Sequence, residues 1–276
     1  MQRQRVLITV KTYPTLSKKY GETVCTAGIR EDGTWVRMYP VPFRRLNEEE
    51  QYRKYDWVEC GLIRNPSDPR PETFRPVDPA ELVAVDHIGT ERDWEERRQL
   101  LLKKARVYDR LDDLITEAKA NISSLAVFKP TKILDFTWEA EERDWDPKKL
   151  QEMRDLHGQL DLFEDNEWRK TFQVIPKLPY SFSYRFLDAA GKQSELQILD
   201  WEAGALYWNC LRNANRNEPI ALEKVRQKYL GEFLTKDLHF FLGTTQQFHF
   251  VAPNPWVIIG VLPIPHQIQE GLFDGL

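Results

Sequence analysis

Thr23-Val24-Cys25-Thr26-Ala27-Gly28-Ile29 and Thr34-Trp35-Val36-Arg37-Met38-Tyr39 are two strand-like stretches on either side of the turn Glu31-Asp32-Gly33. β-branched and aromatic residues are frequent in both stretches, and such residues favour extended backbone. Asp-Gly between two strand patterns is a strong hairpin signal, because glycine accepts the positive φ of a tight turn. In the second stretch the period of two places Trp35, Arg37 and Tyr39 on one face. The sequence therefore predicts a β-rich N-terminal half.

Further strands are expected around this hairpin. Residues 6–10 and 55–63 are strand-like, whereas the proline- and arginine-rich residues 65–72 cannot continue a sheet. Across residues 91–121, apolar side chains recur at helical spacing with charges between them, which predicts one helix or a helical pair. We expect residues 1–140 to form a β-rich domain, a nucleic-acid-binding candidate, with a helical insertion near 91–121.

The second half mixes both kinds of element. Residues 180–188 alternate with Phe182, Tyr184 and Phe186 on one face, which indicates a strand, and residues 195–201 return as its partner. Helices are expected at 202–213 and 218–235, and strands at 125–128, 133–138, 238–242 and 255–262. The predicted fold class is α+β: a β-rich N-terminal half, a linker over 141–175, and an α+β domain over 176–276.

Composition excludes several classes of protein. The chain has 276 residues, a net charge of −4 and no run of about 18 apolar residues, so we expect no membrane partner. The apolar run after Arg5 is too short for a signal peptide. Three cysteines far apart in sequence match neither a disulfide framework nor a zinc site. A cytoplasmic protein is therefore expected.

Basic and aromatic residues alternate in the N-terminal half, where Lys and Arg outnumber Asp and Glu over residues 1–76. Cations suit phosphates and flat rings suit bases, so this pattern predicts a nucleic-acid face. Its candidates are Lys11, Tyr13, Lys18, Lys19, Trp35, Arg37, Tyr39, Arg44 and Arg45. The alternative is that the aromatic rings face a core and the arginines face water.

A resemblance to a known family covers part of this region. Residues 22–37 distantly resemble the opening of dual OB-fold domains, in which a Cys-x-Ala-Gly strand precedes a Gly-x-Trp-x-Arg strand. In this chain the two motifs are Cys25–Gly28 and Gly33–Arg37. The resemblance implies an OB-like barrel that binds nucleic acid.

A short peptide stands in the linker. Gln159-Leu160-Asp161-Leu162-Phe163 resembles the peptide by which bacterial DNA-processing proteins dock on the sliding clamp, and Gln269–Phe273 is a poorer copy. The resemblance implies that Gln159, Leu160, Leu162 and Phe163 bind a clamp groove. We expect the peptide to be exposed, with Gly158 and the residues after Phe163 as loop. The alternative is that its apolar side chains fill a seam between the two halves.

Four carboxylates suggest a second function. Asp188, Glu195, Asp200 and Glu202 are catalytic candidates for a metal-dependent nuclease, in which Mg²⁺ would activate water. Gln197 stands where such nucleases carry lysine, so we expect no robust cleavage. No cofactor is otherwise predicted, and whether the chain is an enzyme stays open.

A third function follows from Gly243-Thr244-Thr245 and His249, which could line the pocket of a small-ligand sensor or scaffold. Taken together, the patterns favour a DNA-associated protein of genome maintenance, or of a mobile-element or defence context. It would bind DNA or RNA and dock on the sliding clamp. The nuclease and the ligand sensor are the alternatives.

Overall fold

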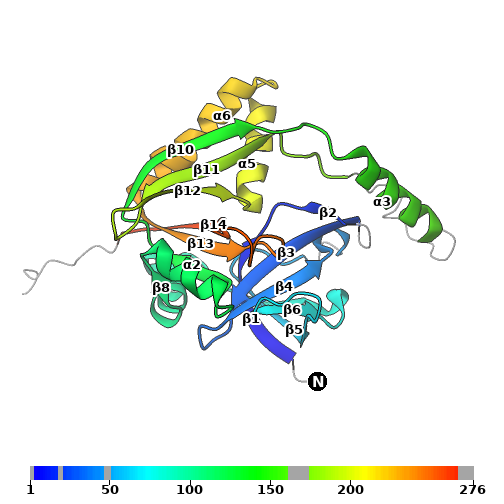
Figure 1. Ribbon diagram of the computed structural model, residues 1–276, viewed down its shortest axis with the longest axis horizontal. Coiled ribbons are helices and arrows are strands. Elements are labelled where there is room, and N and C mark those ends of the chain that lie inside the picture. Colours follow the sequence, from blue (N-terminus) through cyan, green and yellow to red (C-terminus); the bar gives the residue numbers. More distant parts are fainter. Residues whose placement is uncertain (1–2, 18–20, 47–50, 161–173, 267–276) are drawn as a thin grey trace, which may run out of the picture.

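A computed structural model describes residues 3–17, 21–46, 51–160 and 174–266. The chain forms two β-sheets, and helices pack on the second sheet (Figure 1). The α+β class predicted from the sequence is confirmed.

The first sheet closes into a five-stranded barrel. Its strands follow the order β1-β3-β4-β6-β5, and β5 pairs back to β1; their bounds are β1 (Arg3–Lys11), β3 (Gly21–Ile29), β4 (Trp35–Val41), β5 (Asp56–Arg64) and β6 (Thr73–Pro76). The pair β4–β6 is parallel and the other barrel pairs are antiparallel. Short strands β2 (Thr15–Ser17) and β7 (Val83–His87) pair with β3 and β5. The predicted OB-like barrel is thus confirmed.

The second sheet is mixed. Its order is β10-β11-β12-β14-β13-β9-β8, and the bounds are β8 (Val107–Tyr108), β9 (Leu125–Phe128), β10 (Lys132–Ala140), β11 (Tyr180–Leu187), β12 (Gln193–Ile198), β13 (Asp237–Thr244) and β14 (Trp256–Ile264). Strands β8–β10 therefore belong with the C-terminal half, whereas the sequence grouped them with the barrel. The division into domains stays a prediction, but the sheets divide before residue 107 and not near residue 140.

The helices are α1 (Glu91–Arg98), α2 (Leu111–Lys119), α3 (Pro147–Leu160), α5 (Trp201–Asn213) and α6 (Glu218–Arg226). A π-helical turn, Gln99–Lys104, follows α1, and another, Gln227–Glu232, follows α6. Asp200 and Asn217 cap α5 and α6 by accepting backbone N–H groups, which lack partners at a helix start. Among the described residues, no helix is long and apolar enough to cross a membrane.

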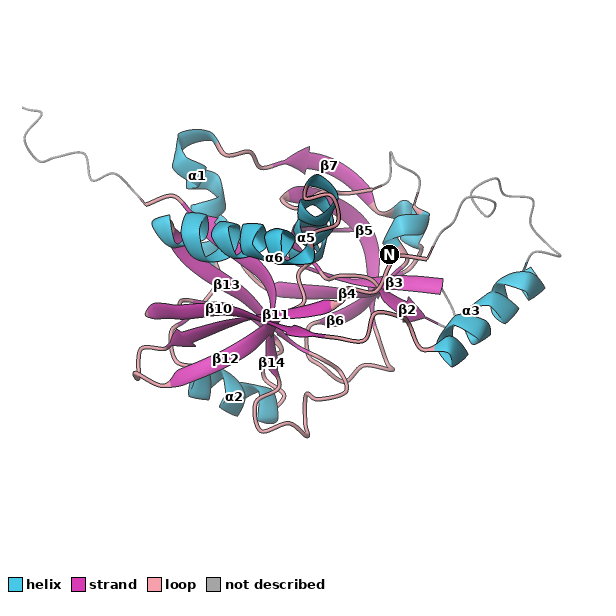
Figure 2. Cartoon of the chain, turned by 90° about the horizontal axis from the view of Figure 1, so that it is seen from above, coloured by secondary structure: helices cyan, strands magenta, loops and turns pink. Residues whose placement is uncertain are grey.

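Helix α3 projects away from both sheets (Figures 1 and 2). It continues through Gly158 to Leu160, so the expectation that a loop begins at Gly158 is wrong. Glycine in a helix interior costs roughly 1 kcal/mol relative to alanine, and the 14-residue helix forms in spite of this cost. Leu162 and Phe163 of the clamp-like peptide, and its copy Gln269–Phe273, lie outside the described residues.

Three apolar clusters hold the layers together. The first fills the barrel with residues such as Val36, Met38 and Val58. The second lies between the barrel and the second sheet, where Ala27 and Ile29 of β3 meet Phe241 of β13. The third packs the far face of the second sheet under α5 and α6.

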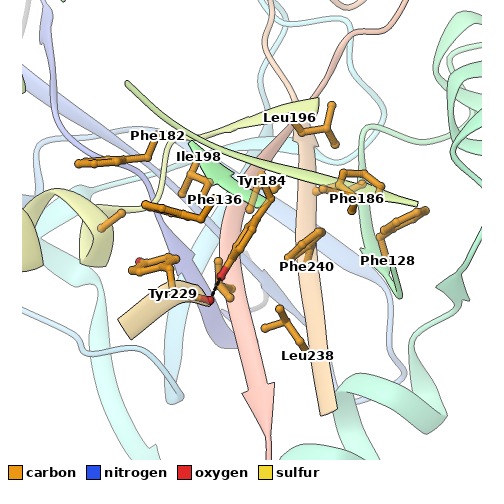
Figure 3. Packing of buried hydrophobic residues seen from close by; sticks show 14 of the residues in the cluster. Phe128, Phe136, Phe182, Tyr184, Phe186, Leu196, Ile198, Tyr229, Leu238 and Phe240 are labelled. Atoms are coloured by element: carbon orange, nitrogen blue, oxygen red, sulfur yellow. Dashed lines mark hydrogen bonds between the residues drawn. The ribbon is translucent and has the colours of Figure 1, made fainter. Parts of the chain in front are cut away.

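This third cluster is rich in aromatic rings. Phe136, Phe182, Tyr184 and Phe240 pack side by side (Figure 3). The Tyr184 hydroxyl donates to the carbonyl of Tyr229 at 2.6 Å, which satisfies its buried oxygen. Because side chains alternate along a strand, β13 sends Phe240 to this cluster and Phe241 to the barrel.

The seam between barrel and sheet gives the first prediction. Phe241 is fully buried and meets Trp35 edge-on, with 5.9 Å between ring centroids. Phe241→Ala should lower the free energy of unfolding by about 3–5 kcal/mol, because it leaves a cavity. Phe248→Ala, which changes a side chain that is 47% exposed, should stay within about 0.5 kcal/mol of wild type. Urea titrations would measure both, and equal losses would contradict a packed seam.

Candidate functional site

A cavity of about 440 Å³ lies between the barrel and the second sheet. β4 contributes Arg37 and Tyr39 from its outer face, and β14 contributes Val257 and Ile259. The other walls include Tyr13, Glu141, Trp145, Lys177, Leu178, Tyr180, Gln197, Ile198, Leu199, Asp200, Thr244, Thr245 and Gln246. The volume lies within the range of about 300–1,000 Å³ that is usual for small-molecule sites.

Arg37 joins the two halves at one wall of the cavity. The residue is 1% exposed, and its guanidinium donates to Ser124 Oγ at 2.6 Å and to the Ser124 carbonyl at 2.8 Å. It also donates to Thr73 Oγ1 on β6 at 3.3 Å. Burial, and then the charge of Arg70, lowers the pKa of Arg37 to about 10, so the group remains charged at neutral pH.

Arg70 is a second buried cation of the same wall. Its guanidinium pairs with Asp68 and donates to the carbonyl of Thr244, the residue that Arg37 reaches at 3.4 Å. Two cations from the barrel half therefore converge on one carbonyl of β13. The nearby carboxylates of Asp68 and Glu72 offset their charge; Glu72 accepts from Ser124 N and Oγ. The result is a buried polar network that fixes the end of β13 against the barrel.

The opposite wall carries Asp200. Its Oδ1 accepts from the N–H of Glu202 at 3.2 Å, as the N-cap of α5. Its Oδ2 is buried, has no hydrogen bond among the described residues, and lies 3.8 Å from Lys54 Nζ. Burial outweighs the attraction of Lys54 and raises the pKa of Asp200 to about 6. Lys54 also bonds Glu202 at 3.0 Å.

One hydroxyl at the cavity lacks a partner. Thr245 Oγ1 is buried and makes no hydrogen bond among the described residues. Its neighbour Thr244 is satisfied, because Thr244 Oγ1 bonds His249 Nδ1 at 2.9 Å. His249 Nε2 bonds Asn121 Oδ1 at 3.0 Å, and burial, followed by the charges of Arg70 and Arg37, lowers the pKa of the ring. His249 thus supports the cavity wall from behind, whereas Thr245 contributes a buried hydroxyl oxygen with no partner among the described residues.

The structure does not present the predicted basic residues as one open face. Lys11 is partly buried, with its Nζ 4.3 Å from the Phe43 ring centroid and 3.1 Å from the Tyr52 carbonyl oxygen; burial lowers its pKa. Tyr13 accepts from Trp208 Nε1 at 2.8 Å and donates to the Pro176 carbonyl. Arg44 pairs with the buried Glu22 at 2.5 Å.

Of the remaining candidates, Trp35 packs in the seam, as the alternative interpretation held. Lys18 and Lys19 lie outside the described residues. Arg45 ends a short 3₁₀ turn, Phe43–Arg45. The assignment of a nucleic-acid face to this set stays a prediction.

The four carboxylates do not gather. Asp188 is buried and accepts the N–H groups of Leu111, Ala190 and Lys192, so it organises the β11–β12 turn. Glu195 pairs with Arg185 at 3.2 Å. Glu195 lies on β12, whereas Asp200 and Glu202 stand at the start of α5, beyond the end of that strand. Among the described residues, no group of three His, Cys, Asp or Glu could hold a metal ion.

Several residues of the site were missed in the sequence. Arg70 stands in the loop 65–72, which the sequence marks only as a break in the sheet. Lys54 and Trp145 belonged to no motif. Asp68 two residues before Arg70 was the available signal, because that spacing permits a local ion pair.

Comparisons with known proteins give two family matches. Residues 2–103 match a domain of unknown function, DUF8758, and residues 107–276 match a domain of unknown function, DUF8757. The comparison with curated proteins gives no match. Among solved structures, a murine DNA-binding protein bound to double-stranded DNA aligns at 11% identity with a TM-score of 0.30, over 95% of this chain and 94% of that chain.

The Arg37 network gives the second prediction. A hydrogen bond to a charged group contributes about 1.5–3 kcal/mol, so losing the two Ser124 bonds in Arg37→Ala should cost at least ~3 kcal/mol of unfolding free energy. Arg53→Ala is the matched control, because its side chain is 76% exposed and should matter by less than about 0.5 kcal/mol. Chemical denaturation would measure both variants. A stable Arg37→Ala protein would show that the network does not hold the halves together.

The third prediction concerns pH. With a folded pKa of about 6, above that of a free carboxyl group, Asp200 holds its proton in the folded state while it is ionised in the unfolded state. In the wild type, the contribution of Asp200 to the free energy of unfolding therefore falls as pH rises from about 4 to 6. Asp200→Asn keeps an N-cap and cannot titrate. Relative to wild type, it should gain stability as pH rises through this window, and thermal melts at several pH values would measure the difference. A difference that is constant with pH would contradict the assignment.

Proposed function

The chain belongs to the family described as the domain of unknown function DUF8757, and from the cavity geometry we propose that it binds nucleic acid by enclosing one unstacked nucleotide. The nucleotide lies between the barrel and the second sheet. One observation carries this proposal: the outer face of β3 and β4 is covered by the second sheet except at the cavity. OB barrels use the corresponding strand face for oligonucleotides.

The chemistry of the walls suits a nucleotide. Tyr13, Tyr39, Trp145 and Tyr180 supply aromatic surface, and Val257 and Ile259 belong to the apolar surface of β14. A base out of its stack is held between such groups. Polar groups that could read its edge come from other walls, namely Gln197, Asp200, Thr245 and Gln246.

An anion binds best beside a cation that it can reach. Lys177 lines the cavity, and its side chain is 24% exposed with Glu142 3.8 Å away. Arg37 and Arg70 also line the cavity, but most of their N–H groups are used by the protein. Lys177 is therefore the residue that we assign to the phosphate, because the charges of the two arginines are already offset by Asp68 and Glu72.

The fourth prediction tests the cavity. Gln197→Ala should weaken binding of a mononucleotide by about 2- to 10-fold, the loss of one hydrogen bond. Gln193→Ala on the same strand is the control, because Gln193 does not line the cavity. Titration calorimetry would measure both. Equal affinities would remove Gln197 from the site.

Thr245→Val sharpens the test. Because Thr245 Oγ1 has no protein partner among the described residues, its loss should not lower the melting temperature. If the hydroxyl binds the nucleotide, the same change should weaken nucleotide binding. An unaltered affinity in both Gln197→Ala and Thr245→Val would contradict the proposal.

The same cavity supports a second candidate, the small-ligand sensor, because Thr244 and Thr245 line it as that hypothesis required. A sensor would bind the free nucleotide as tightly as an oligonucleotide. Docking on a sliding clamp through Gln159–Phe163, with Leu162 and Phe163 as anchors, stays a prediction from the sequence. No observation favours the nuclease.

A further inference from the structure

An open groove of about 780 Å³ adjoins the cavity. Trp145 and Lys177 line both, so the two spaces share a wall. The groove runs between the segments that flank α3 and the helix α5, which contributes Trp208 and Arg212. This arrangement offers a path from the cavity to the surface of the second half.

The groove carries an excess of positive charge. Its lining includes Arg143, Lys177, Arg212 and Arg216 against the two carboxylates of Asp144 and Glu218. Arg143 is neutralised by Glu218 through two bonds of 2.6 and 2.8 Å, and this pair holds the pKa of Glu218 low, at about 2.

Of the other three cations, Lys177 lies 3.8 Å from Glu142, which leaves two arginines. Arg212 and Arg216 are exposed at the end of α5, and no carboxylate pairs with either among the described residues. Within the described part of the chain, the guanidinium of Arg212 donates only to the side-chain oxygen of Asn209, at 3.2 Å. Unpaired, exposed guanidinium groups are available to an external anion.

The aromatic residues of the groove are fixed in place. Trp145 Nε1 donates to the carbonyl of Ile175 at 2.7 Å, and Trp208 Nε1 donates to the Tyr13 hydroxyl at 2.8 Å. Both indoles are half-buried with their single donor satisfied. Rings held in this way lose little conformational entropy when a flat group stacks on them.

We propose that this groove binds the backbone of single-stranded nucleic acid, the strand whose unstacked nucleotide enters the cavity. The inference rests on the proposed function and adds the substrate class: a strand of several nucleotides and not a free nucleotide. Cations that track phosphates beside rings that stack on bases are the two components of single-strand sites. Arg212 and Arg216 contact phosphates, and Trp145 stands where the strand passes from the groove into the cavity.

The fifth prediction tests the groove with Arg212→Gln combined with Arg216→Gln. Each single-strand phosphate contact contributes about 0.7 to the slope of log K against log salt, so two lost contacts should flatten this slope by about 1.4. Binding of a fluorescein-labelled eight-nucleotide DNA or RNA, followed by anisotropy between 50 and 200 mM salt, would measure it, with about tenfold weaker binding expected at the lowest salt. Mononucleotide affinity should not change, because neither arginine lines the cavity.

The control variant is Arg110→Gln combined with Lys119→Gln. It removes the same charge from the two ends of α2, which contributes no residue to the groove. If both double variants bind the oligonucleotide alike, the groove inference is overturned. If wild type binds the oligonucleotide no more tightly than the mononucleotide, the groove is also excluded while the cavity proposal stands. If wild type binds neither, both proposals fail.

Discussion

The architecture depends on two buried guanidinium groups. Arg37 and Arg70 come from the barrel half, are almost fully buried, and donate to Ser124 and Thr244 of the second half. A buried cation is costly unless it is fully paired, so the network is favourable only when both halves stand in one arrangement. Apolar packing around Phe241 holds the two halves together, but the hydrophobic effect is non-directional and does not fix their relative orientation. The guanidinium groups therefore set the relative position of barrel and sheet, and with it the shape of the cavity.

Much of the fold could be predicted from local patterns. Alternation in Phe182–Phe186 and the Asp32-Gly33 turn predicted strands that exist, because a sheet with one buried face must alternate. The sheet that residues 107–140 join could not be predicted in this way. Strands β8–β10 carry ordinary strand patterns, and nothing in a strand's own sequence states which sheet it will join. Pairing partners far apart in the chain, such as β9 with β13, are decided by global packing.

The site was predictable only in part. The face formed by Trp35, Arg37 and Tyr39 was identified correctly from the period of two, but the sequence could not show that a second sheet covers it. An arginine can bind a phosphate at the surface or a carbonyl in a core, and the sequence does not show which of the two it does. The same limit applies to Asp188 and Asp200, two carboxylates near one hairpin. Asp188 accepts the N–H of Leu111, whereas Asp200 accepts an N–H at the start of α5. The type of a side chain limits the interactions that it can make, and its burial determines which of these interactions forms.

The cavity belongs to the pairing of the halves and to neither half alone. Its Arg37 wall comes from the barrel, and its Thr244 and Ile259 wall comes from the sheet. If recombination joined the barrel to a different second domain, the pocket would be lost, because part of its wall comes from the second sheet. The two halves must therefore evolve together. A change in the register of β13, or in the loop that holds Arg70, alters the pocket that both halves form. Selection on this site would act on the seam, at positions that no catalytic or binding motif would mark.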